Sequence, residues 1–88
     1  MTTKPAAAVQ AFTPEALEKI AYSSVSTIPT EEPNDRNRLG YHIWRWLSSK
    51  QGSLEKAIAE SGSRLKITQQ ETLRIIQEEL KKQGVLPS

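Results

Sequence analysis

The amino-acid sequence predicts an all-α fold, a small bundle of three to four helices. Apolar residues recur at helical spacing, for example at Leu73, Ile76 and Leu80. Serine or threonine precedes several such segments and glycine follows them, at the positions that cap helix ends. The 88 residues have room for a single domain. We therefore expect one helical domain at residues 13–88, preceded by a flexible tail at residues 1–12.

The first helix is predicted to begin after Thr13, because Pro14 fits the first helical position and Glu15 the first turn. It should end at Ser23 or Ser24. Residues 26–33 contain two prolines and no helical spacing of apolar residues, which predicts an extended connector. This connector should separate a light N-terminal helix from the main core.

The second helix is predicted to begin near Asn34 or Asp35, either of which can cap it, and to run to Lys50, with Gly52 placed to end it. Its two faces differ in character. The apolar face carries Leu39, Ile43, Trp46 and Leu47. The opposite face carries Arg38, Tyr41, Arg45 and Ser48, with Trp44 beside them. That aromatic and basic face can stack nucleic-acid bases, or the first helix can cover it.

Ser53 is predicted to cap a short third helix that Gly62 ends. Residues 64–67 alternate basic and apolar residues, which is typical of an extended turn or a short strand. Thr68 and Glu71 form a T-x-x-E capping box at the start of the fourth helix. The predicted core consists of Leu39, Ile43, Trp46, Leu47, Leu54, Ile58, Leu65, Leu73, Ile76 and Leu80.

The composition excludes several classes of function. With no cysteine and one histidine, the chain lacks thiolate and imidazole ligands for zinc or copper, and we expect neither a metal nor another cofactor. The paired glutamates at residues 31–32 and 78–79 do not converge on a substrate, so we predict no enzymatic activity. No apolar stretch reaches the roughly 20 residues of a membrane span. We therefore expect a cytoplasmic protein.

Basic residues gather in one part of the chain. Residues 36–66 hold seven lysines and arginines against two glutamates, although the net charge of the whole chain is only +2. This local excess fits either a surface that faces phosphates or an ordinary solvated face.

The segment from Thr72 to Leu86 resembles the recognition helix of winged-helix transcriptional regulators. Those helices commonly show threonine, an aliphatic residue and arginine at the start, leucine eight residues after the threonine, and glycine with two aliphatic residues at the end. The helix at residues 53–62 is similar to the first limb of a helix-turn-helix, and residues 34–50 to the leading helix. The resemblance implies a helix-turn-helix-like core and a regulatory function. We expect no β-hairpin wing. The connector before Thr68 is also longer than the tight turn of a usual helix-turn-helix.

This resemblance implies binding of duplex DNA, with a homodimer to enlarge the footprint. On the fourth helix one stripe can supply arginine to guanine, glutamine to adenine and lysine to phosphate. The predicted nucleic-acid-binding residues are Lys50, Arg64, Lys66, Gln70, Arg74, Gln77 and Lys81.

A protein-interaction module or small regulatory subunit is the alternative. Aromatic residues and arginine dominate the energetics of protein interfaces. The residues predicted for such an interface are Tyr41, Trp44, Arg45 and Ile75. Because Ile75 lies opposite the buried stripe of its helix, it must be exposed, covered by the first helix or buried in a partner.

Overall fold

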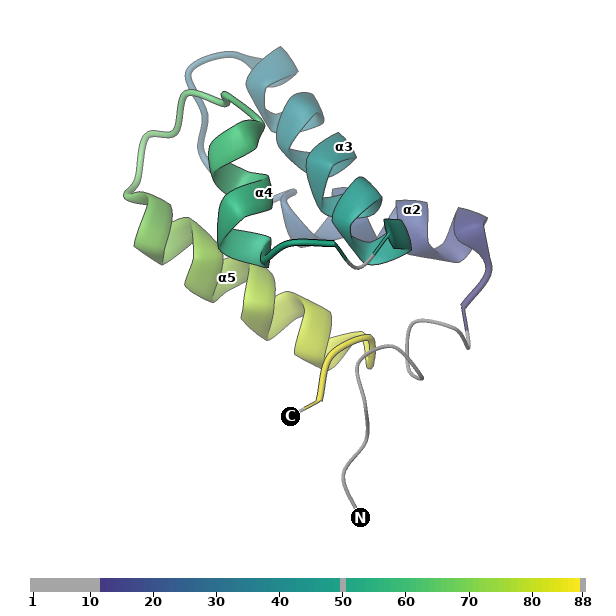
Figure 1. The fold of residues 1–88 in the computed structure, drawn as a ribbon. Coiled ribbons are helices and arrows are strands. Elements are labelled where there is room, and N and C mark those ends of the chain that lie inside the picture. The colour runs from purple at the N-terminus through teal and green to yellow at the C-terminus, as the bar shows by residue number, and fades with distance from the viewer. Residues whose placement is uncertain (1–11, 50, 88) are drawn as a thin grey trace.

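A computed structural model describes residues 12–49 and 51–87 of the chain. These residues form four helices: α2 (Pro14–Ser24), α3 (Pro33–Ser49), α4 (Leu54–Glu60) and α5 (Gln69–Lys82). Helix α4 lies between α3 and α5 in the view of Figure 1, with α2 behind them. The predicted all-α fold is confirmed. None of the described helices is both long enough and apolar enough to span a bilayer.

Three of the predicted helix starts carry their expected caps. The hydroxyl of Thr13 accepts a hydrogen bond from the N–H of Ala16, at 3.1 Å, and Ser53 caps α4 in the same way. The Thr68 hydroxyl accepts from the N–H of Glu71 at 3.0 Å. The Glu71 carboxylate accepts hydrogen bonds from the Arg74 guanidinium. The threonine half of the capping box is therefore present, while the glutamate serves an ion pair.

The end of α5 is a Schellman motif around Gly84, which has a φ of +84°. The N–H of Val85 donates to the carbonyl of Leu80, and that of Gly84 to Lys81, both at 3.1 Å. Leu80 and Val85 are fully buried, so the turn that ends the helix also adds an apolar residue to the core.

Helix α3 begins at Pro33, so both predicted caps, Asn34 and Asp35, lie within its first turn. Proline fits this position because the N–H that it lacks would have had no helical partner. The N–H of Glu32 donates to Asp35 Oδ2 at 3.1 Å. Asp35 therefore caps the helix from inside its first turn, as the acidic residue of a capping box does.

The N-terminal helix is an integral part of the core, contrary to the prediction of a light, separate element. Leu17 and Ala21 are buried on α2, and Val25 and Ile28 are buried just beyond it. Helix α2 packs along α3 and also contacts α5. Tight hydrogen bonds in the turn, such as Ile28 N–H to the Val25 carbonyl at 3.0 Å, hold these two apolar side chains inward.

Most of the predicted core residues are buried. The structure buries Leu39, Ile43, Leu47, Leu54, Ile58, Ile76 and Leu80. Trp46, Leu65 and Leu73 are half-buried and pack against this core from its edge, so the prediction that they lie within it is wrong. Phe12, at the boundary of the predicted tail, is also half-buried against the core, whereas residues 1–11 lie outside the described residues.

The two connectors pair with each other. Thr30 and Leu65 form an isolated antiparallel bridge. The N–H of Glu31 donates to the Arg64 carbonyl at 2.9 Å, and that of Lys66 to the Pro29 carbonyl at 3.0 Å. The extended segment predicted at residues 64–67 therefore finds its partner in the proline-containing connector.

Gly40 of α3 lies directly against the Tyr22 ring of α2. A Cβ at this position would lie 2.5 Å from Cδ1 of the Tyr22 ring and 2.8 Å from Cε1. These distances are far shorter than van der Waals contact, so the ring packs where any other residue would place its side chain.

We predict that Gly40→Ala destabilises the protein by about 1 to 3 kcal/mol, because the new methyl group overpacks the interface between the helices. In an exposed helix the same change would stabilise by roughly 0.5 to 1 kcal/mol, so the sign of the effect is diagnostic. Chemical denaturation gives the free energy of unfolding. In a Tyr22→Ala background the penalty should disappear, and a penalty that persists there would contradict the assigned contact.

Candidate functional site

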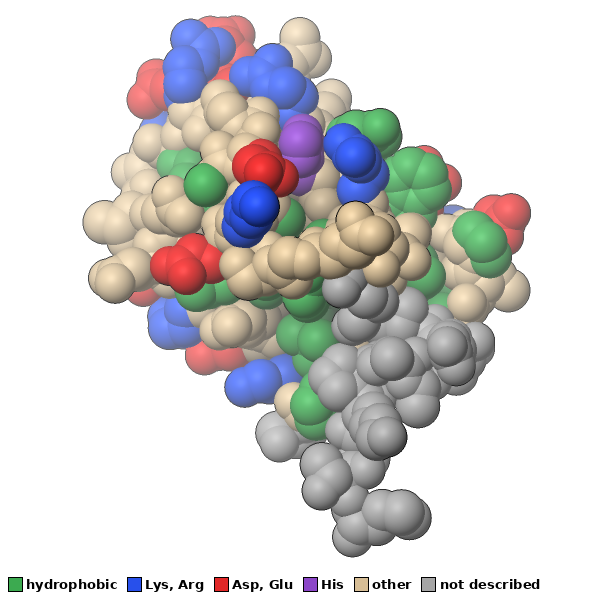
Figure 2. Space-filling model, in the orientation of Figure 1, with side chains coloured by type: hydrophobic (Ala, Val, Ile, Leu, Met, Phe, Trp, Pro, Cys, Tyr) green, Lys and Arg blue, Asp and Glu red, His purple; other side chains and the backbone are tan. Residues whose placement is uncertain are grey.

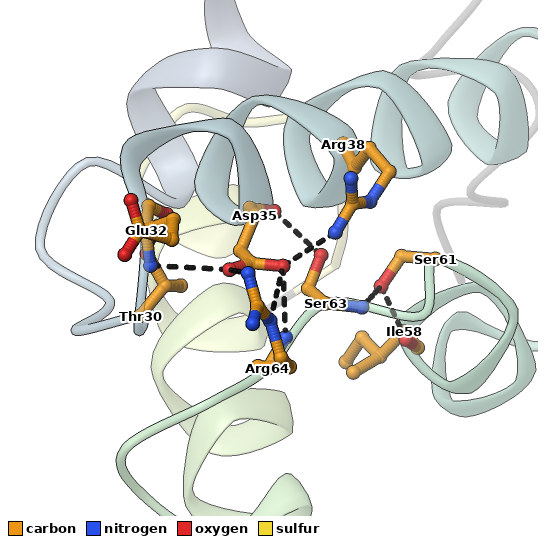
Figure 3. Close-up of polar contacts among 8 residues, drawn as sticks. All are labelled: Thr30, Glu32, Asp35, Arg38, Ile58, Ser61, Ser63 and Arg64. Atoms are coloured by element: carbon orange, nitrogen blue, oxygen red, sulfur yellow. Dashed lines mark hydrogen bonds and ion pairs between the residues drawn. The ribbon is translucent and has the colours of Figure 1, made fainter.

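A buried carboxylate, that of Asp35, organises the most extensive polar cluster of the described residues (Figure 3). Its side chain is 0% exposed. The carboxylate accepts from the backbone N–H of Arg64 at 3.2 Å and from the Arg38 guanidinium at 2.5 Å. The Arg64 guanidinium completes an ion pair with Asp35 Oδ2 at 3.1 Å. This cluster ties the start of α3 to the connector between α4 and α5.

A second contact strengthens the same junction. The Ser63 hydroxyl donates to the backbone carbonyl of Asp35 at 2.5 Å, so both the main chain and the side chain of Asp35 hold the connector. Burial acts to raise the pKa of Asp35, but the hydrogen bonds and the charge of Arg64, with the N–H of Glu32, outweigh it and lower that pKa. The ionised carboxylate is therefore a structural group of the fold.

Arg64, one of the predicted DNA-binding residues, also binds the buried carboxylate of Asp35. Its hydrogen bond to Asp35 raises the pKa of the guanidinium. The side chain is still 64% exposed, so it presents part of its charge to solvent while it binds the carboxylate.

The predicted DNA-contacting stripe of α5 is a continuous exposed surface. Gln70, Arg74, Gln77 and Lys81 are all exposed. At its centre Arg74 forms ion pairs with Glu71 and with Glu78, the latter at 3.1 Å. These hydrogen bonds, led by those to Glu71, raise the pKa of Arg74, and the same contact lowers the pKa of Glu71. The central cation of the stripe is therefore flanked by two carboxylates.

Two further predicted DNA-binding residues, Lys50 and Lys66, precede α5 in the sequence. Lys66 is exposed on the connector that precedes α5. Lys50 lies outside the described residues.

The aromatic and basic face of α3 is present at the surface. Tyr41 is 44% exposed, a larger fraction than for any other large hydrophobic side chain of the described residues. The Arg45 guanidinium lies 5.8 Å from the centre of the Tyr41 ring, in cation–π geometry. The ring of His42 meets Tyr41 edge-on at 5.7 Å, and that of Trp44 lies 6.0 Å away. We call the set Tyr41, His42, Trp44 and Arg45 the α3 aromatic surface.

Trp44 is not a freely exposed member of this surface. It is half-buried and packs against the hydrophobic core, and its Nε1 is a buried donor with no hydrogen-bond partner in the described structure. Ile75 of α5 is likewise half-buried against the core. Substitution of either residue therefore affects stability as well as any interface, and the expectation that Trp44 points away from the core is wrong.

A pocket of about 210 Å³ adjoins the α3 aromatic surface, between the second half of α3, the loop that follows it and α4. Its polar lining includes His42, Arg45, Ser49, Gln51, Lys56 and Glu60. Of these lining residues, Arg45 alone is among the predicted site residues. The lining residues lie up to 18 positions apart on two helices and a loop, and no spacing pattern links them.

Comparisons of this chain with protein-family models, with curated proteins and with solved structures found no match.

We predict that Asp35→Asn lowers the unfolding midpoint at pH 7 by at least about 10 °C, because the cluster loses its charge and half of its acceptors. The pKa of Asp35 is lower in the folded protein than its ordinary value of 3.8. The stabilisation is therefore complete well above pH 3.8 and is lost as the pH falls through the folded pKa. Thermal melts from pH 7 to pH 2 should show the gap between wild type and variant closing below about pH 4.

Glu55→Gln is the matched control, since it removes an exposed carboxylate from α4. It should move the midpoint little at any pH. A gap between wild type and Asp35→Asn that stays constant down to pH 2 would show that the charge of Asp35 does not stabilise the fold.

Proposed function

We propose that the protein is a small helical interaction module that binds a protein partner through the α3 aromatic surface. The partner would place apolar atoms against Tyr41 and a carboxylate on Arg45. Aromatic and arginine side chains are the residues that most often carry the binding energy of protein interfaces.

The availability of Arg45 carries this proposal. Four of the five arginines, all of them described, bind an acceptor of the protein itself: Arg36, Arg38, Arg64 and Arg74. Among the described residues Arg45 has neither a carboxylate nor a carbonyl partner, and its recorded contact is the Tyr41 ring. Its five N–H donors are therefore available to an external acceptor.

The ring beneath Arg45 favours the same conclusion. An arginine that lies over an aromatic ring loses less conformational freedom when it binds than a lysine on a flexible stem. Tyr41 also offers a large apolar ring with a polar hydroxyl, which suits a surface that is solvated in the free protein and buried in a complex. The two side chains therefore form a preorganised contact on a rigid helix.

We predict that the immobilised wild-type protein enriches a specific partner from a nuclease-treated lysate of its native cells. The double variant Tyr41→Ala/Arg45→Ala should reduce that enrichment at least about tenfold. Quantitative mass spectrometry measures the enrichment. Both side chains are exposed, so the variant should keep the wild-type unfolding midpoint.

Gln77→Ala on α5 is the control and should retain the partner, because it changes an exposed residue on another helix. Equal enrichment by the wild type and the double variant would refute the assigned surface. A concentration-dependent mass in light scattering that the double variant abolishes would identify a second copy of this chain as the partner.

Binding of duplex DNA is the second candidate, and one observation favours it. The exposed stripe of α5 aligns two glutamines with two basic residues on one helix, as direct readout in a major groove requires. The flanking carboxylates of Glu71 and Glu78 oppose it, since they would face the phosphates together with Arg74. In this proposal α4 and α5 act as the two helices of a helix-turn-helix-like unit, and the protein binds DNA as a homodimer.

If α5 contacts DNA, Arg74→Ala should weaken binding about tenfold or more, and Glu78→Gln should strengthen it because one repulsive charge is removed. Fluorescence anisotropy across a salt series would measure both effects, with a log–log slope of about −0.9 for each phosphate contacted. Lys19→Ala on α2 is a charge-matched control. A DNA affinity that changes neither with salt concentration nor with the Glu78 substitution would exclude the stripe as a DNA contact.

A further inference from the structure

The pocket between α3 and α4 has the polarity of an anion site. Arg45 and Lys56 supply two cations to its lining, against a single carboxylate from Glu60. Figure 2 shows the only histidine of the chain on this face, with lysine or arginine side chains and one acidic side chain close to it. The pocket therefore gathers positive charge from two helices that are separated by a loop.

The donors of this pocket are only weakly engaged within the protein. Arg45 has no acceptor among the described residues. The ion pair between Lys56 and Glu60 spans 3.9 Å, and both side chains are largely exposed, which makes it a weak contact. The Ser49 oxygen accepts from the N–H of Gln51 at 3.3 Å, so its own hydrogen remains available to donate. An incoming anion would meet donors that need not first break strong bonds.

The loop that closes the pocket is held in place by the protein. Nε1 of Trp46 donates to the carbonyl of Gly52 at 3.1 Å. Gly52 has a φ of +75°, in the left-handed region that favours glycine. Ser53 next to it caps α4, with its hydroxyl accepting from the N–H of Lys56 at 3.0 Å. These contacts fix the spacing between the two cations, as a preformed site requires.

The size of the pocket limits its ligand. Its volume is about 210 Å³. It can therefore hold one small polyatomic anion, and it is smaller than the cavities of roughly 300 Å³ or more that enclose drug-sized ligands. The charge and the volume together favour a group with two or three oxygens, which an arginine can bind through paired hydrogen bonds.

We propose that this pocket binds a small oxyanion, a carboxylate or phosphate group, held by Arg45 and Lys56. Such a group comes either free in solution or as an acidic side chain of a docked protein. The site stands on its own geometry and does not require the partner proposed above.

The test is a titration of the full isotope-labelled chain with inorganic phosphate, at constant ionic strength, followed by nuclear magnetic resonance. The ring protons of His42 and the indole N–H of Trp46 report on the pocket. Phosphate should move both signals along a saturating curve. In Arg45→Gln and in Lys56→Gln the affinity should fall at least about tenfold, because each variant loses a charged hydrogen-bond donor.

Two further variants sharpen the outcome. Glu60→Gln should bind phosphate several-fold more tightly, since it removes the one negative charge of the lining and frees Lys56. Lys82→Gln, an exposed change at the end of α5, should bind like the wild type. Circular dichroism spectra of all four variants should match the wild type, because every changed side chain is exposed.

A second arm separates the two sources of the anion. A short glutamate-rich peptide and its glutamine counterpart are titrated in the same way. The pocket is assigned to a protein side chain if the glutamate peptide saturates it at a lower concentration than phosphate does and the glutamine peptide does not saturate it. Tighter binding of phosphate assigns it to a free anion. Linear shifts with both probes, or saturation unaffected by Arg45→Gln, would overturn the proposal. Lys56→Gln removes a donor of the pocket but keeps Tyr41 and Arg45, so failure of the docking surface and failure of the pocket can be told apart.

Discussion

The buried charge of Asp35 is the constraint on which the rest of the structure depends. A carboxylate with no exposure to water must find donors within the protein, since an unpaired buried charge is strongly destabilising. Those donors come from Glu32 and Arg38 beside it and from Arg64, which lies 29 residues further along the chain. The start of α3 and the connector before α5 are thereby held together, and the pairing of the two connectors follows from that attachment.

This constraint also decides which cations remain for external partners. The sequence shows an excess of basic residues in positions 36–66, but two of them, Arg38 and Arg64, bind the internal carboxylate of Asp35. Arg64 and Arg74 are both paired within the protein, whereas Arg45 lies over an aromatic ring. Arg45 and Lys56 both line the pocket between α3 and α4, beside Tyr41. The two proposed sites meet at Arg45, so a partner docked on the helix face can place an acidic group in the pocket.

The packing of α2 connects stability to these surfaces. Close approach of the Tyr22 ring to Gly40 seats α2 against α3, and the same pair of helices supplies much of the buried core. Trp44 packs against that core while it borders the exposed tyrosine. The α3 aromatic surface thus has an exposed edge, Tyr41 with Arg45, and a supporting interior, which keeps the exposed edge in one geometry.

The helical class, three helix caps, the glycine that ends α5 and most of the buried stripe of each major helix were predictable from the amino-acid sequence. These features depend on residues three to seven positions apart, whose relative placement on a helix is set by its pitch. Tertiary structure alone decided the burial of Asp35, the place of α2 in the core, the pairing of Thr30 with Leu65 and the composition of the pocket. Each of these joins residues whose distance in space is set by how helices pack, and no periodic pattern encodes that distance. Even the ion pairs around Arg74, which are local in sequence, needed the structure to show which of several neighbouring charges the guanidinium selects.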